Sequence, residues 1–92
     1  MNKENKLEHL LGYYRVILEL TYDEHDKLQR ERPADEITTL TRKKKIIMTC
    51  IIDLDKEIKP YTKSMQDYLI QIRNVVGEIL SLDQQNKMLM HK

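Results

Sequence analysis

The sequence lacks Phe and Trp, and it contains one Cys, two Gly and two Pro in 92 residues. A single cysteine, Cys50, excludes an internal disulfide, and its place in the apolar stretch 46–52 predicts a buried thiol in a reducing compartment. Because Gly and Pro are scarce while Leu, Ile, Lys, Glu and Asp dominate, the composition favours long helices.

Long hydrophobic runs are also missing. No segment approaches the ~18 unbroken apolar residues that a membrane span requires. The N-terminal segment MNKENKLEHLLGYY carries acids among its bases and has no apolar run of the length that a signal peptide needs. We therefore expect a soluble, cytoplasmic protein that does not insert into a membrane.

An excess of charge of one sign is absent as well. Sixteen basic and fifteen acidic side chains give a net charge of +1, which excludes a general electrostatic attraction to nucleic acid or to anionic membranes. The run Arg42 to Lys45 is basic, but four consecutive residues spread around more than one helical turn, so we interpret it as a solvated surface. Other proteins are the expected partners.

Apolar residues recur at steps of three and four and predict a first helix over about residues 5–32. Pro33 predicts the end of this helix near Arg32, and Asp35 fits the N-cap of the next helix. The residues of the first apolar stripe are Leu7, Leu11, Tyr14, Leu18, Thr21, His25 and Leu28.

A second helix is predicted over about residues 36–59, where one heptad pattern has a single charged exception, Lys44. The short loop makes this helix antiparallel to the first, and Glu24 and Lys44 lie equally far from the loop centre near Ala34. We therefore predict a structural ion pair between Glu24 and Lys44, the alternative being that Lys44 extends to water. The a and d positions of this heptad pattern form the seam of the helix, and they are Ile37, Leu40, Lys44, Ile47, Ile51, Leu54 and Ile58.

A third helix is predicted over about residues 62–90, and the heptad phase continues through Pro60 without a slip. Either the chain reverses near 59–62 and closes a three-helix bundle, or the second and third helices form one kinked rod that pairs with another chain. The predicted fold is thus all-α, a single domain over 1–92, built as an antiparallel helical hairpin extended to a three-helix bundle or coiled coil.

Groups for chemistry are sparse. His9, His25 and His91 are too far apart to form a helical metal site, and His25 falls on a seam where a hydrogen-bonded imidazole is expected. Gly12 and Gly77 lie inside helical patterns, where we expect them to permit close helix approach or a slight bend. All-helical chorismate mutases need several converging Arg and Lys side chains, but only Lys44 occupies a seam. We expect no enzyme, no catalytic residue, no cofactor and no metal.

The last helix carries apolar residues beyond its seam, which predicts a partner-binding face. Alternatively, both of its stripes pack against the other two helices, as is common in bundles. The candidate contact residues are Leu69, Ile72, Val75, Val76, Ile79, Leu80, Leu82 and Leu89.

The order of these features resembles the FlgN-type flagellar export chaperones. The resemblance rests on residues of all three helices: Leu18, Glu24 and Leu28; Ile37, Leu40 and Lys44; Ile51, Leu54 and Asp55; and the segment Ile72 to Leu89. It implies a cytosolic chaperone that binds and shields an amphipathic helix of hook-associated or related type III secretion subunits. The alternative is a structural coiled-coil or adaptor protein that forms a homodimer through its C-terminal helix.

Overall fold

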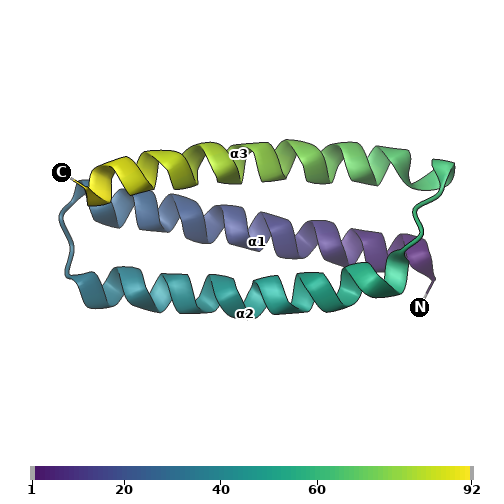
Figure 1. The fold of residues 1–92 in the computed structure, drawn as a ribbon, viewed down its shortest axis with the longest axis horizontal. Helices are drawn as coiled ribbons and strands as arrows, with labels where there is room; N and C mark the ends of the chain where they lie inside the picture. The colour runs from purple at the N-terminus through teal and green to yellow at the C-terminus, as the bar shows by residue number, and fades with distance from the viewer. Residues whose placement is uncertain (1, 92) are drawn as a thin grey trace.

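The computed structural model describes residues 2–91 and contains three long helices that run up, down and up (Figure 1). They are α1 (Lys3–Gln29), α2 (Ala34–Ile58) and α3 (Gln66–Met90), and a short 3-10 turn, η1 (Lys63–Met65), leads into α3. The chain reverses after α2, so the bundle forms and the kinked rod does not. Within residues 2–91 there is no strand, and the predicted all-α class is confirmed.

The helix α1 ends three residues earlier than predicted. Glu31 adopts a left-handed backbone with φ of 55°, the Arg32 amide donates to the Lys27 carbonyl at 2.9 Å, and the Glu31 amide donates to the Leu28 carbonyl at 3.2 Å. These two bonds form a Schellman motif, in which Glu31 occupies the position that glycine usually takes. The turn therefore ends the helix before Pro33 can.

The helix α2 begins at Ala34, two residues earlier than predicted. Its N-cap is Pro33 rather than the predicted Asp35. Asp35 and Glu36 instead lie in the first turn, where acidic side chains are favourable. The prediction was wrong because the fixed φ of proline and the following Ala34 already suit a helix start. The Glu36 carboxylate accepts a hydrogen bond from Arg32 at 2.8 Å, which lowers the pKa of Glu36.

The reversal between α2 and α3 is built around Pro60. The Lys59 amide still donates to the Asp55 carbonyl at 3.1 Å, and then the backbone of Lys59 becomes extended, as the residue before a proline prefers. Thr62 is the N-cap of η1, and the α-helix proper begins at Gln66 rather than near residue 62.

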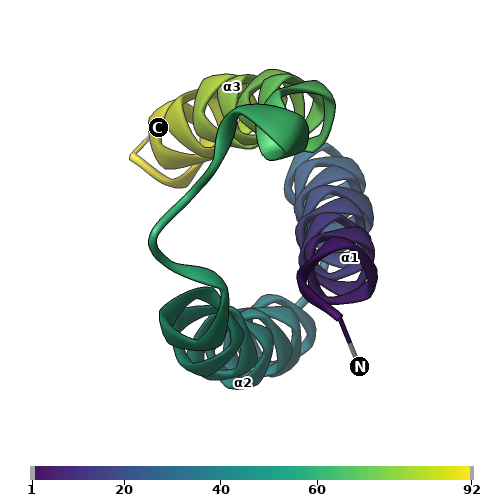
Figure 2. The ribbon, with the colours of Figure 1, turned by 90° about the vertical axis from the view of Figure 1, so that its right-hand side faces the viewer.

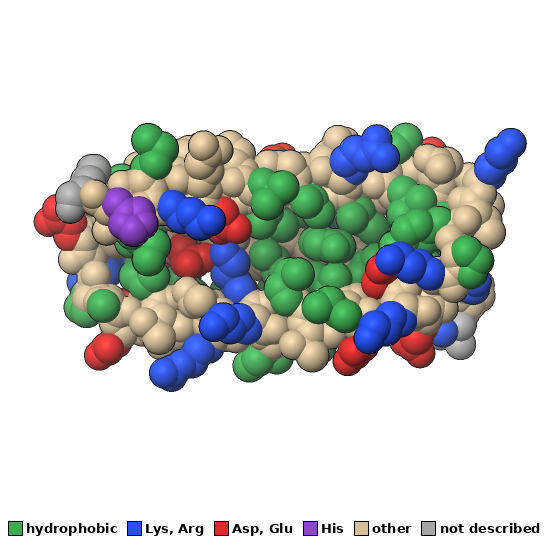
Figure 3. All heavy atoms as spheres, viewed as in Figure 1, with side chains coloured by type: hydrophobic (Ala, Val, Ile, Leu, Met, Phe, Trp, Pro, Cys, Tyr) green, Lys and Arg blue, Asp and Glu red, His purple; other side chains and the backbone are tan. Residues whose placement is uncertain are grey.

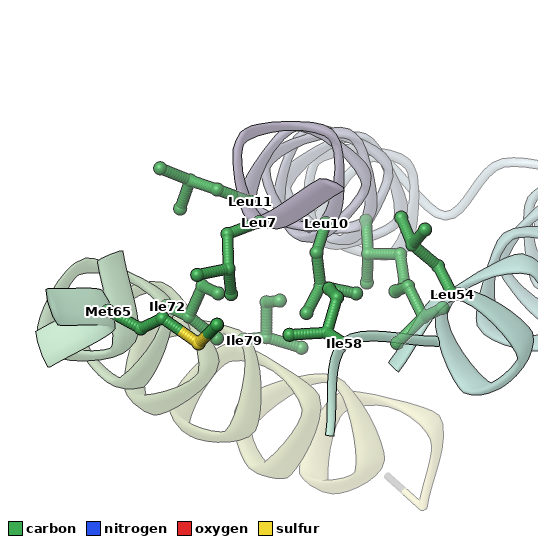
Figure 4. Packing of buried hydrophobic residues seen from close by; sticks show 10 residues of the cluster. Leu7, Leu10, Leu11, Leu54, Ile58, Met65, Ile72 and Ile79 are labelled. Atoms are coloured by element: carbon green, nitrogen blue, oxygen red, sulfur yellow. The ribbon is translucent and has the colours of Figure 1, made fainter. Parts of the chain in front are cut away.

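The core lies along α1, because α2 and α3 each pack against α1 and hardly approach one another (Figure 2). Side chains from all three helices point into this interior (Figure 4), and Leu7 of α1 and Ile58 of α2 are fully buried. The result is an elongated bundle of 44 × 20 × 15 Å in which α2 and α3 do not close against each other. The labelled core residues are Leu7, Leu10, Leu11, Leu54, Ile58, Met65, Ile72 and Ile79.

The two glycines do not serve close helix packing. A Cβ built on Gly12 or on Gly77 would meet no atom of a neighbouring element within 4 Å. Both residues lie inside α-helices and neither has a positive φ. The expectation that they permit close approach of two helices is therefore wrong.

Candidate functional site

An apolar groove lies between α2 and α3, and α1 forms its floor. Its volume is about 300 Å³, and a strip of hydrophobic side chains runs along it between the two outer helices (Figure 3). The groove exists because α2 and α3 both pack on α1 but not on each other. We call this surface the α2–α3 groove, and its lining residues are Tyr14, Ile17, Lys44, Met48, Val76, Ile79, Leu80 and Asp83.

The edges of the α2–α3 groove are apolar and exposed. Leu80 on α3 is 62% exposed and Met48 on α2 is 40% exposed. Ile52, 51% exposed, lies one helical turn beyond Met48 on the same side of α2. The floor residues Ile17 and Ile79 are buried in the core. The groove thus offers uncovered apolar surface directly above the core of the bundle.

The predicted contact residues on α3 divide into three groups. Val76 and Leu80 line the α2–α3 groove, and Leu80 is the exposed member of the whole set. Ile72, Ile79 and Leu82 are buried by the packing of the bundle itself, and of these Ile79 also lies at the floor of the groove, so a partner reaches them fully only if the helices separate. Leu69, Val75 and Leu89 are partly buried, and Leu89 lines a different hollow beside Leu28 and Ile37.

Sequence reasoning missed the contribution of α2 to this surface. Met48 and Ile52 lie four residues apart beside the heptad seam, which is the same off-seam signal that singled out Leu69, Val76 and Leu80 on α3. The signal was therefore present on both helices. What the pattern does not give is the rotation that turns the two off-seam stripes toward each other.

An ion triad of Glu24, Lys44 and Asp83 closes one end of the groove. Lys44 Nζ lies 2.6 Å from Glu24 Oε1, so the pair expected from the loop geometry is present. The same ammonium lies 3.0 Å from Asp83 Oδ1 on α3, and Thr41 donates to Glu24 at 3.4 Å. Among residues 2–91, the contact between Lys44 and Asp83 is the one polar side-chain link between α2 and α3.

A second polar layer fixes α1 against α3 behind the triad. His25 Nδ1 and Asn86 Oδ1 are 2.8 Å apart, and the amide nitrogen of the buried Asn86 donates to the Thr21 carbonyl at 3.3 Å. The Thr21 hydroxyl in turn donates to the Ile17 carbonyl at 2.7 Å. Throughout residues 2–91, every buried side-chain N or O atom has a hydrogen-bond partner. These polar groups therefore set the register of the helices without strain on the core.

A second polar cluster lies at the C-terminal end of α2. The Tyr61 hydroxyl donates to the Asp55 carboxylate, and Lys59 Nζ lies 3.1 Å from the other oxygen of that carboxylate. Burial, followed by the hydrogen bond to Asp55, raises the pKa of Tyr61 to about 12. Burial and the charge of Asp55 also raise the pKa of Tyr14 on the groove floor. Both phenols are therefore neutral at physiological pH.

The described residues form no metal-ligand cluster and no membrane-spanning helix. Nowhere in residues 2–91 do three His, Cys, Asp or Glu side chains gather as metal ligands would. None of the three long helices is both long and apolar enough to cross a membrane. The α2–α3 groove, which is lined mainly by apolar side chains from all three helices, is the candidate functional site.

Comparison with known proteins gives no further guide, since no family model, no curated protein and no solved structure matches this chain.

Proposed function

We propose that this chain is a cytoplasmic helix-binding chaperone of the FlgN type, which escorts flagellar hook-associated or related type III secretion subunits. The observation that carries the proposal is the α2–α3 groove, where apolar side chains of two helices stay uncovered above a finished core. An amphipathic helix laid in such a groove buries its apolar face against both edges. It would complete a four-helix arrangement of the kind that bundles adopt.

The amount of apolar surface suits a partner that must later be released. Full burial of a Leu or Met side chain stabilises by about 1.5–3 kcal/mol, and about half of Leu80 and of Met48 is already covered. Each therefore adds about 1 kcal/mol on binding. Part of the total is spent in ordering a client helix that is unfolded before capture. Moderate affinity and fast exchange are the expected outcome, as handover to an export gate requires.

The test is a titration of the purified chain with terminal helical segments of the hook-associated subunits from the same organism, followed by fluorescence anisotropy. A double variant, Met48→Glu with Leu80→Glu, places two charges on the groove edges and should abolish binding. A matched control, Val16→Glu with Ile46→Glu, changes residues of similar exposure, 41% and 67%, that lie outside the groove lining. Equal loss in both variants, or binding unaffected by the groove variant, would contradict the proposal.

The second candidate function is self-association through the C-terminal helix. It is favoured by Met88 and Met90, which are 69% and 58% exposed at the end of α3 and lie outside the α2–α3 groove. Sedimentation of the purified chain separates the two functions. A dimer that persists on dilution and dissociates in Met88→Glu would support an assembly protein, whereas a monomer supports the chaperone.

A further inference from the structure

Exposed positive charge without an ion-pair partner lies on α2 and α3 beside the residues that line the α2–α3 groove. Lys45 lies one helical turn from Met48 on α2, Arg73 lies one turn from Val76 on α3, and Lys87 lies one turn beyond the α3 carboxylate of the ion triad. All three side chains are exposed. Among residues 2–91, no carboxylate comes within ion-pair distance of any of them, although several other Lys and Arg side chains are paired.

The carboxylates of the ion triad and of the C-terminal end of α2 are, by contrast, already engaged. Lys44 holds Asp83 and Glu24, while Lys59 and Tyr61 hold Asp55. Lys and Arg side chains border both edges of the apolar strip in the space-filling view (Figure 3). The triad of one ammonium and two carboxylates carries one net negative charge, so the three exposed cations leave this face positive although the whole chain has a net charge of only +1.

From this charge arrangement, and on the basis of the proposed function, we infer that the occupant of the groove is an amphipathic helix of a different protein whose apolar stripe is flanked by Asp and Glu. Complementary charge at the rim of an interface selects partners and speeds their encounter. The groove lining on α3 runs from Val76 to Asp83 and spans roughly 10 Å at about 1.5 Å per residue, so the client helix has roughly two turns in contact.

Two other occupants fit this face less well. In a two-fold dimer each patch meets its own copy, so a second copy would bring the unpaired cations of both grooves together. A lipid bilayer would attract the cations, but its flat surface does not reach a floor formed by Ile17 and Ile79 between two helices. The recessed shape favours a single helix.

The experiment uses two synthetic peptides with the same apolar stripe, one flanked by Glu and one flanked by Lys, titrated into the full chain at low and high salt. Each exposed ion pair changes affinity by roughly twofold, so three of them should make the Glu-flanked peptide bind roughly tenfold more tightly at low salt. High salt should largely remove this difference. Equal affinities, or a preference for the Lys-flanked peptide, would overturn the inference and leave the proposed function intact. Failure of both peptides to bind would overturn both.

Charge-reversal variants test whether the preference for the Glu-flanked peptide arises at the groove. Lys45→Glu with Arg73→Glu should reverse the preference toward the Lys-flanked peptide. Lys3→Glu with Arg42→Glu, also exposed but more than one helical turn from any apolar residue of the groove lining, should leave it unchanged. If both pairs of substitutions reversed the peptide preference, the preference would come from net charge rather than from the groove, and the inference would be refuted. Binding to anionic phospholipid vesicles that the groove variant abolishes, or a dimer that it dissociates, would likewise overturn the inference.

Discussion

Replacing Lys44 with Met removes the cation that, among residues 2–91, joins all three helices. Its side chain is 15% exposed and that of Glu24 is 10% exposed, while that of Asp83 is 38% exposed. Removing one partner of a buried ion pair destabilises by about 3–5 kcal/mol, because the other charge stays buried and unpaired. Asp83 can be rehydrated but Glu24 cannot, so we expect the lower end of that range, about 3 kcal/mol at neutral pH.

For a chain of this size, such a loss lowers the melting temperature by on the order of 15 °C. Urea and thermal unfolding followed by far-UV circular dichroism measure both quantities. Adding Glu24→Gln to Lys44→Met removes the stranded charge and should restore at least half of the lost free energy. A change below about 0.5 kcal/mol in Lys44→Met would mean that the ammonium is solvated and that the triad does not hold the helices together.

Further perturbations test the fold. Gly12→Ala and Gly77→Ala should each raise the free energy of unfolding by about 0.5–1 kcal/mol, because a Cβ has open space at both helical positions and glycine loses more entropy on folding. Glu31→Gly should stabilise by up to about 1 kcal/mol, since it removes a left-handed backbone strain that glycine does not feel. The pKa of Tyr61 is raised to about 12, so the folded state keeps the phenol proton to a higher pH than the unfolded state does. The stability that Tyr61 contributes is therefore fully present below about pH 10 and is lost between about pH 10 and 12. Asp55→Asn should lower the pKa of Tyr61, as measured by ultraviolet absorbance titration.

Each of these predictions has its own check. Glu8→Gly, an exposed position in the second turn of α1, should destabilise by about 1 kcal/mol where Glu31→Gly stabilises. Destabilisation by either glycine-to-alanine change would show that the space around that residue is needed. Tyr61→Phe should remove the phenol whose pKa is raised to about 12, and an unchanged titration curve would refute its assignment.

Periodic patterns in the sequence determined the local structure. The stripes of Leu and Ile at steps of three and four specified three helices, and the equal spacing of Glu24 and Lys44 from the loop placed that ion pair, because a short loop leaves an antiparallel hairpin only one register. The helix ends were less accurate. The Schellman turn at Glu31 and the cap at Pro33 depend on backbone dihedrals that residue identity only biases.

The tertiary structure alone decided how far the third helix rotates and how closely it approaches the second. Heptad spacing shows that α3 has apolar residues on and beside its seam, but it does not say which stripe meets α1. In the folded chain Ile72 and Ile79 face the core, while Val76 and Leu80 lie opposite Met48 across an open groove. Hydrophobic burial is non-directional, so the sum of contacts between three helices sets this rotation, and no single segment of the sequence encodes it.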